Sequence, residues 1–168
     1  MSRDLADLTD EFRAKVEELL QNCHAKGFEM KPCWTLRTPM EQATLWQQSR
    51  TDTEVSVGVQ MLKDRGAPWL ASVLAACPRQ FGKVEVTKAL PGASWHHFGE
   101  AVDCYWDYNG IARWGGPAFD VYKQEAMKLG LTPLSFERVH VQLRSQGSPS
   151  ALWVWPDIDG RLKEKFGP

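Results

Sequence analysis

Apolar side chains recur at three- and four-residue steps from Leu5 to about Lys26, which predicts one amphipathic helix. Gly27 follows directly, and glycine is the residue most typical of helix C-termini. The next apolar stretch, from Met30 to Leu36, is short and predicts a strand. The chain is therefore expected to start with a helix followed by a strand.

Polar residues mark the start of a second helix. Thr38, Pro39 and Glu41 occupy the places of an N-cap, a first-turn proline and a capping-box acid. The helix that they begin is expected to extend to residue 47 or 48. It places Arg37 immediately before a helix and Gln42 in the first turns of that helix.

The pattern is least regular from residue 51 to residue 83, where one short helix is expected after Pro68, and we interpret residues 52–83 as an insertion. Strands and helices follow in mixed order, without the regular alternation of a parallel sheet. We expect an α+β fold, with a small, mainly antiparallel sheet and flanking helices, in one domain over residues 1–168. The expected elements are strands at Val84 and Val86, at Gly99 to Trp106 and at Val139 to Leu143, and a helix from Pro117 to Leu129.

Charge and hydropathy exclude several classes of protein. The 20 basic residues nearly balance the 21 acidic ones, and no run of five or six like charges is present, which argues against a nucleic-acid partner. The basic tail residues Arg161, Lys163 and Lys165 alternate with acids and are interpreted as a solvated helix face. No window approaches the roughly 18 apolar residues of a membrane span, and the charged start lacks a secretory signal. We expect a monomer that is synthesised in the cytoplasm.

Cysteine and tryptophan give weaker signals. The four cysteines form no C-x-x-C pair, so buried reduced thiols are expected. Eight tryptophans beside only three tyrosines are unusual, and most of them are expected in the core, with the lining of a cleft as the alternative for some. Trp153-Val154-Trp155 is interpreted as a strand or turn that packs its rings, with a glycan contact as the alternative. Asp157 and Asp159 lack the later ligands of a calcium loop and are interpreted as a cap or turn.

The first segment that indicates chemistry runs from Ser94 to Asp103. If His96 enters a strand here, Gly99, Ala101 and Asp103 share one face of it. Two small side chains then leave open space beside a carboxylate, as a metal or substrate site requires. His97 repeats the histidine, but the spacing to Gly99 and Asp103 favours His96, which leaves His97 adjacent to the site or exposed.

The second segment surrounds His140. Alternation puts His140 and Gln142 on one strand face and the apolar Val141 on the other, with Glu137 just upstream. Any one of these histidines alone is more typical of a hydrogen-bonded core or surface residue. Together, His96, Asp103 and His140 would supply two nitrogens and one oxygen, a set that suits zinc and leaves a fourth position for water. Glu137 could then act as general base in amide hydrolysis.

The spacing Ser-x-His-x-x-Gly-x-Ala-x-Asp, followed later by Glu-x-x-His, resembles the zinc peptidases related to D-Ala-D-Ala carboxypeptidases, lysostaphin and the hedgehog amino-terminal domain. Within that group the chain is most similar to the L-alanyl-D-glutamate endopeptidases of phage endolysins and bacterial cell-wall enzymes. The closer similarity covers residues 5–143 outside the insertion. It rests on Leu36-Arg37-Thr38 with Gln42, on Leu45-Trp46 leading to Ser49-Arg50-Thr51, and on Val86-Thr87 leading to Gly92 and Ser94.

This resemblance implies a fold of the hedgehog and D-Ala-D-Ala-peptidase type with one zinc per chain, held by His96, Asp103 and His140. It implies Glu137 as the catalytic base, and places Arg37, Gln42 and Ser94 at substrate-contacting positions. Arg37 would hold a carboxylate or an oxyanion of the peptidoglycan stem peptide. The alternative for Arg37 is a salt bridge at a helix start.

Three functions follow as alternatives. The first is L-alanyl-D-glutamate cleavage, and the second is D,D-carboxypeptidase or D,D-endopeptidase activity, which the sequence Glu137-Arg138-Val139-His140 resembles more closely. The third is a zinc-binding recognition module without turnover. The family's Trp-Gly-Gly precedes the catalytic acid directly, whereas Trp114-Gly115-Gly116 stands about twenty residues earlier here.

The resemblance also implies where the chain acts. We expect action on the cell wall after holin-type release or secretion-system export. Sequence alone does not choose between these routes, and it identifies no immunity or release partner.

Overall fold

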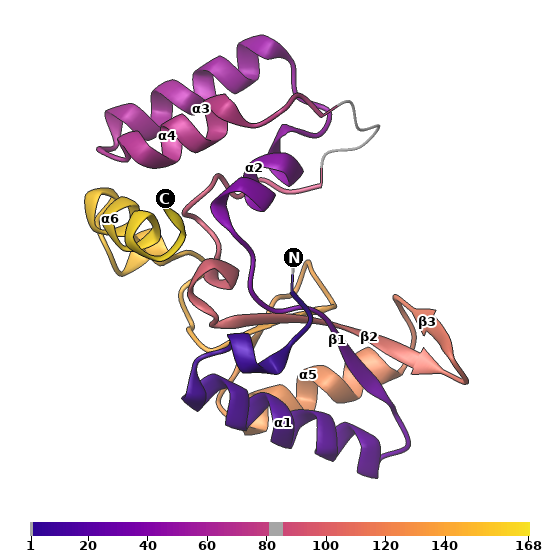
Figure 1. Cartoon of the computed structure of the whole chain (residues 1–168). Coiled ribbons are helices and arrows are strands. Elements are labelled where there is room, and N and C mark those ends of the chain that lie inside the picture. Colours follow the sequence, from indigo (N-terminus) through magenta and orange to yellow (C-terminus); the bar gives the residue numbers. More distant parts are fainter. Residues whose placement is uncertain (1, 81–85) are drawn as a thin grey trace. The chain divides into compact units, whose positions relative to one another are not determined.

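The computed structural model describes residues 2–80 and 86–168 (Figure 1). It divides into two compact units, each built from two stretches of the chain. The first, which we call the sheet unit, comprises Met1–Leu36 and Phe98–Ser145. The second, the helical unit, comprises Arg37–His97 and Gln146–Pro168. The expectation of one domain over residues 1–168 stays a prediction.

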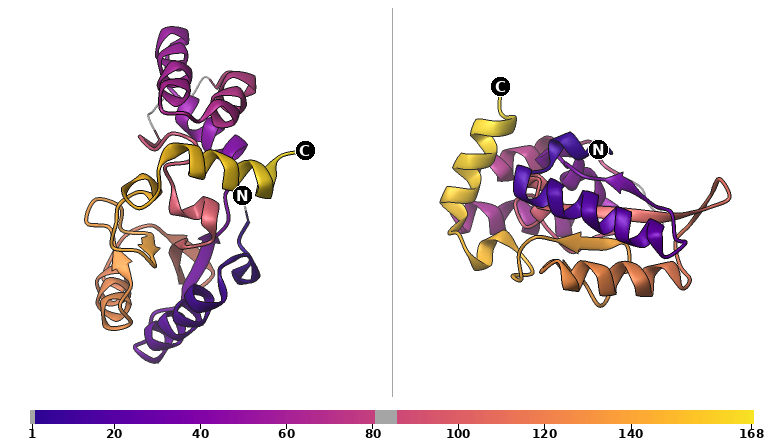
Figure 2. Two further views of the ribbon diagram at one scale, coloured as in Figure 1. Left: turned by 90° about the vertical axis from the view of Figure 1, so that its left-hand side faces the viewer. Right: turned by 90° about the horizontal axis from the view of Figure 1, so that it is seen from below.

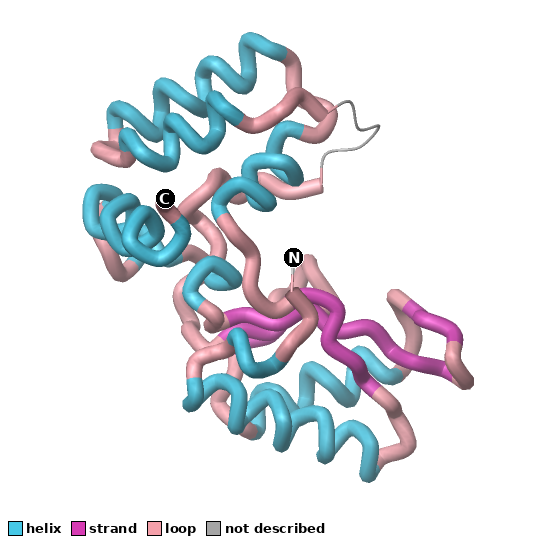
Figure 3. Tube along the Cα trace, viewed as in Figure 1, coloured by secondary structure: helices cyan, strands magenta, loops and turns pink. Residues whose placement is uncertain are grey.

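The sheet unit contains an antiparallel sheet of five strands in the order β1-β2-β5-β4, with β3 paired to β2 (Figure 3). Helices α1 (Asp10–Ala25) and α5 (Ala118–Lys128) pack against each other, as Figure 2 shows. This arrangement confirms the α+β prediction. The strands are β1 (Met30–Trp34), β2 (Ala101–Tyr108), β3 (Ile111–Arg113), β4 (Thr132–Pro133) and β5 (His140–Gln142).

Alternation along β2 separates the core of the sheet unit from the opposite sheet face. Val102 and Cys104 are fully buried and join the hydrophobic core that α1 and α5 cover. Their neighbours Asp103 and Tyr105 therefore project from the other face of the strand. On β5, Val141 belongs to the same core, so His140 also projects away from it. One face of the sheet thus holds the fold together, and the other carries polar groups.

The helical unit consists of α2 (Pro39–Gln47), α3 (Asp52–Asp64), α4 (Pro68–Ala76) and α6 (Trp155–Phe166). Helix α4 packs against the other three helices. Short 3-10 helices lie at η1 (Leu5–Asp7) in the sheet unit, at η2 (Trp95–Phe98) and at η3 (Pro149–Ala151). Among the described residues, no helix has the length and apolar character needed to cross a membrane.

Several predicted elements are confirmed. Thr38 and Glu41 form the predicted capping box at the start of α2. The helix expected after Pro68 is α4, and the helix expected from Pro117 to Leu129 is α5. All four cysteines are free and buried. The first helix, which was expected to start at Leu5, is divided in the structure: η1 covers Leu5–Asp7, and α1 begins at Asp10.

Other predictions were wrong. His96 does not enter a strand: it lies in η2, and β2 starts at Ala101. Gly99 between them has φ +69°, and a Cβ there would stand 2.6 Å from the carbonyl oxygen of Asp7. Because only glycine fits this close approach without strain, the chain turns from η2 into the strand here.

The insertion holds α3 as well as the expected short helix. Val84 lies outside the described residues, and Val86 is not in a strand. Of the segment interpreted as a strand or turn, Trp153 lies in a bend, Val154 is the N-cap of α6, and Trp155 is the first residue of that helix.

Candidate metal centre

The pairing of β2 with β5 brings two predicted metal ligands together. Asp103 stands directly opposite His140 in the antiparallel register. Nδ1 of His140 lies 2.9 Å from Oδ1 of Asp103, and both side chains are buried. Nε2 of the same ring lies 3.2 Å from Oε1 of Gln142. Gln142 received no role from the sequence, although its two-residue spacing from His140 puts it on the same strand face.

The electrostatics of His140 follow from this pairing. Burial alone lowers the pKa of the imidazole, because it disfavours the charged form. The hydrogen bond to Asp103 and its negative charge outweigh burial, so the pKa of His140 is raised. Glu137 adds to the same effect. The site therefore favours a cation next to Asp103.

His96 completes the predicted ligand set. In the described ranges 2–80 and 86–168, His96, Asp103 and His140 form a buried group whose ligand atoms all lie within 4.8 Å of one another. Two imidazole nitrogens and one carboxylate oxygen are a donor set that zinc accepts, with a further position left for water or substrate. The residues present therefore fit a bound metal ion.

Glu137 lies outside this group, in the exposed loop between β4 and β5. Its carbonyl oxygen accepts a hydrogen bond from the backbone N–H of His140 at 3.2 Å. The backbone thus ties the predicted base to one of the predicted ligands while the carboxylate stays accessible. A general base needs this combination of fixed attachment and access.

Arg37 is buried and precedes α2, as predicted. Its Nη1 donates to Oε1 of Gln42 at 3.0 Å, and Nε2 of Gln42 donates to the carbonyl of Ala89 at 2.7 Å. The backbone N–H of Arg37 donates to the carbonyl of His96 at 3.3 Å. Gln42 therefore positions the guanidinium of Arg37, and Arg37 is anchored to the helical turn that carries His96.

His97 is fully buried, so the alternative of an exposed position was wrong. Its Nδ1 lies 2.7 Å from the carbonyl oxygen of Arg37 and must donate, since a carbonyl only accepts. Burial lowers the pKa of His97 to about 3, so the ring is neutral. His97 thus fixes the backbone of Arg37.

Ser94 is half-buried and immediately precedes η2. Its carbonyl accepts a hydrogen bond from the backbone N–H of His97 at 3.2 Å. The backbone of Ser94 helps to close the turn that carries His96. A contact of its hydroxyl with substrate stays a prediction.

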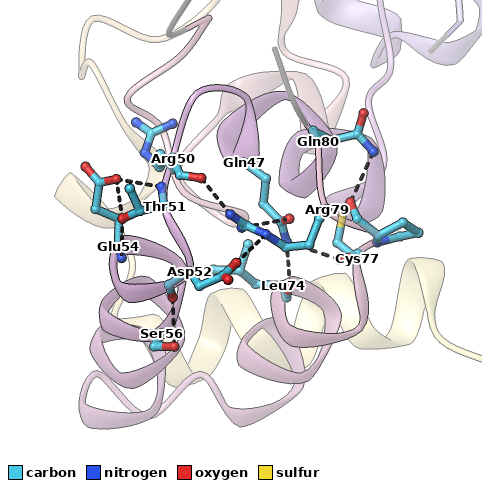
Figure 4. Close-up of polar contacts among 11 residues, drawn as sticks. Gln47, Arg50, Thr51, Asp52, Glu54, Ser56, Leu74, Cys77, Arg79 and Gln80 are labelled. Atoms are coloured by element: carbon cyan, nitrogen blue, oxygen red, sulfur yellow. Dashed lines mark hydrogen bonds and ion pairs between the residues drawn. The ribbon is translucent and has the colours of Figure 1, made fainter. Parts of the chain in front are cut away.

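The Ser49-Arg50-Thr51 motif has a structural explanation (Figure 4). Thr51 caps α3 in a capping box with Glu54. The guanidinium of Arg50 lies over the Trp46 ring at 4.1 Å and donates to the carbonyl of Thr87 at 3.0 Å. Arg79 donates to the carbonyl of Arg50 at 2.6 Å. The motif therefore joins α2, α3 and the chain that follows them.

Cys33 and Cys104 are poor candidates for an alternative nucleophile. Burial raises the pKa of Cys33 to about 12 and that of Cys104 still further. A thiol must ionise before it attacks a carbonyl, so these groups are inert near neutral pH.

Comparison with known proteins agrees with this geometry. A search of curated proteins finds no match to the chain. The family model VanY, D-alanyl-D-alanine carboxypeptidase, matches residues 6–142, which hold all seven predicted site residues. The chain therefore belongs to the VanY family of D-alanyl-D-alanine carboxypeptidases, a family of peptidoglycan peptidases.

Proposed function

We propose that the protein is a zinc-dependent peptidase that hydrolyses amide bonds in peptidoglycan stem peptides. The observation that carries this proposal is the buried group of His96, Asp103 and His140 in a chain of the VanY family. Zinc bound there would lower the pKa of a water molecule to about 7 and polarise the scissile carbonyl.

The chain's own residues supply the remaining steps. Glu137 takes a proton from the attacking water and passes it to the leaving amine, because its backbone is bonded to His140 and its carboxylate is exposed. Arg37, held by Gln42, offers a donor fork to a substrate carboxylate or to the developing oxyanion. The positions of Gln42 and His97 support a role in keeping that fork in place.

We propose the bond between L-Ala and D-Glu as the site of cleavage. The resemblance at Arg37 and Gln42 supports this choice, whereas Arg50 and Thr51 no longer do, because their contacts are structural. The second candidate is D,D-carboxypeptidase activity, which the family match and the Glu137-x-x-His140 spacing favour. For either bond the cell wall is the proposed place of action, reached by release or export.

Digestion of purified peptidoglycan, followed by mass spectrometry of the fragments, tests the proposal. The samples are wild type, chelated protein, chelated protein restored with zinc, Glu137→Gln, and Arg138→Gln as an exposed neighbour. Wild type and Arg138→Gln should release the same fragments. Glu137→Gln should bind zinc but lose about 10²–10⁴-fold in rate, the usual contribution of a general base.

The fragments name the bond. Lactyl-L-Ala ends indicate L-alanyl-D-glutamate cleavage, and terminal D-Ala indicates the second candidate. Zinc binding without any fragment would contradict the peptidase proposal and favour a recognition module. Full rate in Glu137→Gln would remove Glu137 from its proposed role.

A further inference from the structure

The sheet face that carries Asp103 continues along β2 as an aromatic surface. Tyr105 follows Asp103 by two residues on the same face, so its Cα lies about 7 Å further along the strand. The rings of Tyr105 and Trp114 meet at a centroid distance of 5.8 Å and an angle of 44°. Trp114 comes directly after β3, which pairs with β2. We call these two residues the Tyr105/Trp114 pair.

This pair is accessible and is not needed for the core of the sheet unit. Trp114 is 57% exposed, and Tyr105 is half-buried. The core includes Val102 and Cys104, which lie on the opposite face of the strand. A large indole that leaves more than half of its surface in water gains little for folding, and such residues are characteristic of binding surfaces.

Polar groups border the pair on the same face. Lys31 stands opposite Tyr105 in the β1–β2 register. It forms an ion pair with Asp107, which follows Tyr105 by two residues. Two flat rings beside a charged hydrogen-bonding pair suit a ligand with both apolar C–H faces and hydroxyl or amide groups. A sugar ring has this combination.

We propose that the Tyr105/Trp114 pair binds the N-acetylmuramoyl sugar that carries the stem peptide. The inference rests on the proposed peptidase function and deepens it. In peptidoglycan the sugar joins L-Ala through a lactyl group, so about two residue lengths, or about 7 Å, separate it from the carbonyl between L-Ala and D-Glu. Tyr105 lies at the same distance, about 7 Å, from Asp103 along β2.

The same arithmetic separates the two candidate bonds. At the D-Ala–D-Ala bond the sugar would be at least five residue lengths, about 17 Å, from the scissile carbonyl. The Tyr105/Trp114 pair is too near Asp103 for that spacing. Occupation by the sugar therefore supports L-alanyl-D-glutamate cleavage.

The first test is binding, which is independent of turnover. The disaccharide N-acetylglucosaminyl-N-acetylmuramic acid, without a peptide, is titrated into ¹⁵N-labelled wild type, and the Trp114→Phe spectrum assigns the Trp114 indole signal. We expect a selective shift of that signal. An unchanged signal at saturating sugar would overturn the inference, whether or not the protein is a peptidase. A shift without any turnover would leave the subsite standing and reject the peptidase function.

The second test uses two substrates that share one peptide. One carries the disaccharide, and the other carries an N-acetyl group in its place. Trp114→Ala should lower kcat/KM about tenfold on the first substrate and leave the second within twofold. Tyr108→Ala is the matched control, because Tyr108 is an exposed aromatic residue on the opposite face of the same hairpin. Equal effects of Trp114→Ala on both substrates would contradict a sugar subsite.

Discussion

Gln42 illustrates how a residue can be singled out from sequence while its contacts within the protein are not. The resemblance placed it among substrate contacts, yet both ends of its amide are engaged by the protein. Its oxygen accepts from Arg37, and its nitrogen donates to Ala89, 47 residues away. No local sequence pattern predicts a hydrogen-bond partner at that separation. The structure therefore shows that Gln42 holds the guanidinium of Arg37, and a contact of Gln42 with substrate stays a prediction.

Gln42→Met tests this role because it keeps the length of the side chain and removes both hydrogen bonds. The site is fully buried. We expect the free energy of unfolding to fall by about 1–3 kcal/mol, the cost of losing buried hydrogen bonds. Urea denaturation measures the change. Gln60→Met, at an exposed position of α3, should stay within about 0.5 kcal/mol of wild type. An unchanged stability of Gln42→Met would show that these contacts carry little weight.

At the scale of single residues, the sequence located Asp103, His140 and Arg37 correctly in their elements. Strand alternation suffices for the first two, because a two-residue period leaves only one face for each. The burial of His97 could not be predicted. It depends on the carbonyl of Arg37, which the fold brings to it across 60 positions of the chain.

Among the elements, α3 is the helix that sequence reasoning missed. Its sequence contains Val55, Val57 and Val59 at alternate positions, a pattern typical of a strand. The capping box of Thr51 and Glu54 was the signal that could have found it. Packing of α3 on its neighbours then outweighs the weak intrinsic preference of valine.

Gly58 in α3 shows how tight that packing is. A Cβ at Gly58 would stand 2.5 Å from Cη2 of the buried Trp46 ring in α2. Alanine normally stabilises a helix by about 1 kcal/mol relative to glycine. Here the clash should dominate, so we expect Gly58→Ala to destabilise by about 1–2 kcal/mol net.

Gly160 in α6 is the matched control, since nothing lies within 4 Å of its Cβ position. Gly160→Ala should stabilise by about 0.5–1 kcal/mol. Thermal and urea unfolding of both variants measure the two signs. A gain in both variants would mean that the Trp46 ring moves aside at little cost.

Helix α4 is capped by another helix. Its N-cap residue, Ala67, has no side-chain cap, and the carboxylate of Asp159 in α6 instead accepts from the N–H groups of Trp69 and Leu70 at 3.2 and 2.8 Å. This confirms the interpretation of Asp159 as a cap. We expect Asp159→Ala to lower stability by about 1–2 kcal/mol. Asp157→Ala, at an exposed position of the same helix, should change the urea midpoint little. Equal midpoints for the two variants would contradict capping across helices.

For the whole molecule, the α+β class was predictable but the two compact units were not. Each unit is assembled from two separated stretches of the chain, and no change of composition marks their boundaries. The order of elements along the sequence shows the class, because mixed strands and helices exclude a parallel sheet. Which stretches come together depends on long-range packing, which local patterns do not contain.

The proposed metal site makes a prediction for the stability of the whole chain. His96, Asp103 and His140 come together only in the folded protein, since 37 residues separate the last two. Zinc should therefore bind the native state and stabilise it, by about 4 kcal/mol when the free ion exceeds its Kd about 1,000-fold. Thermal unfolding with a zinc buffer and after chelation measures this.

The control for that measurement is Asp103→Ala, which removes one proposed ligand. We expect the midpoint of this variant to be the same with and without zinc, whereas wild type and Glu137→Gln should both respond, because Glu137 lies outside the ligand group. A zinc response that persists in Asp103→Ala would place the metal elsewhere. A response lost in Glu137→Gln would make Glu137 a ligand instead of a base. The pair of variants thus separates the residue proposed to hold the metal from the residue proposed to move the proton.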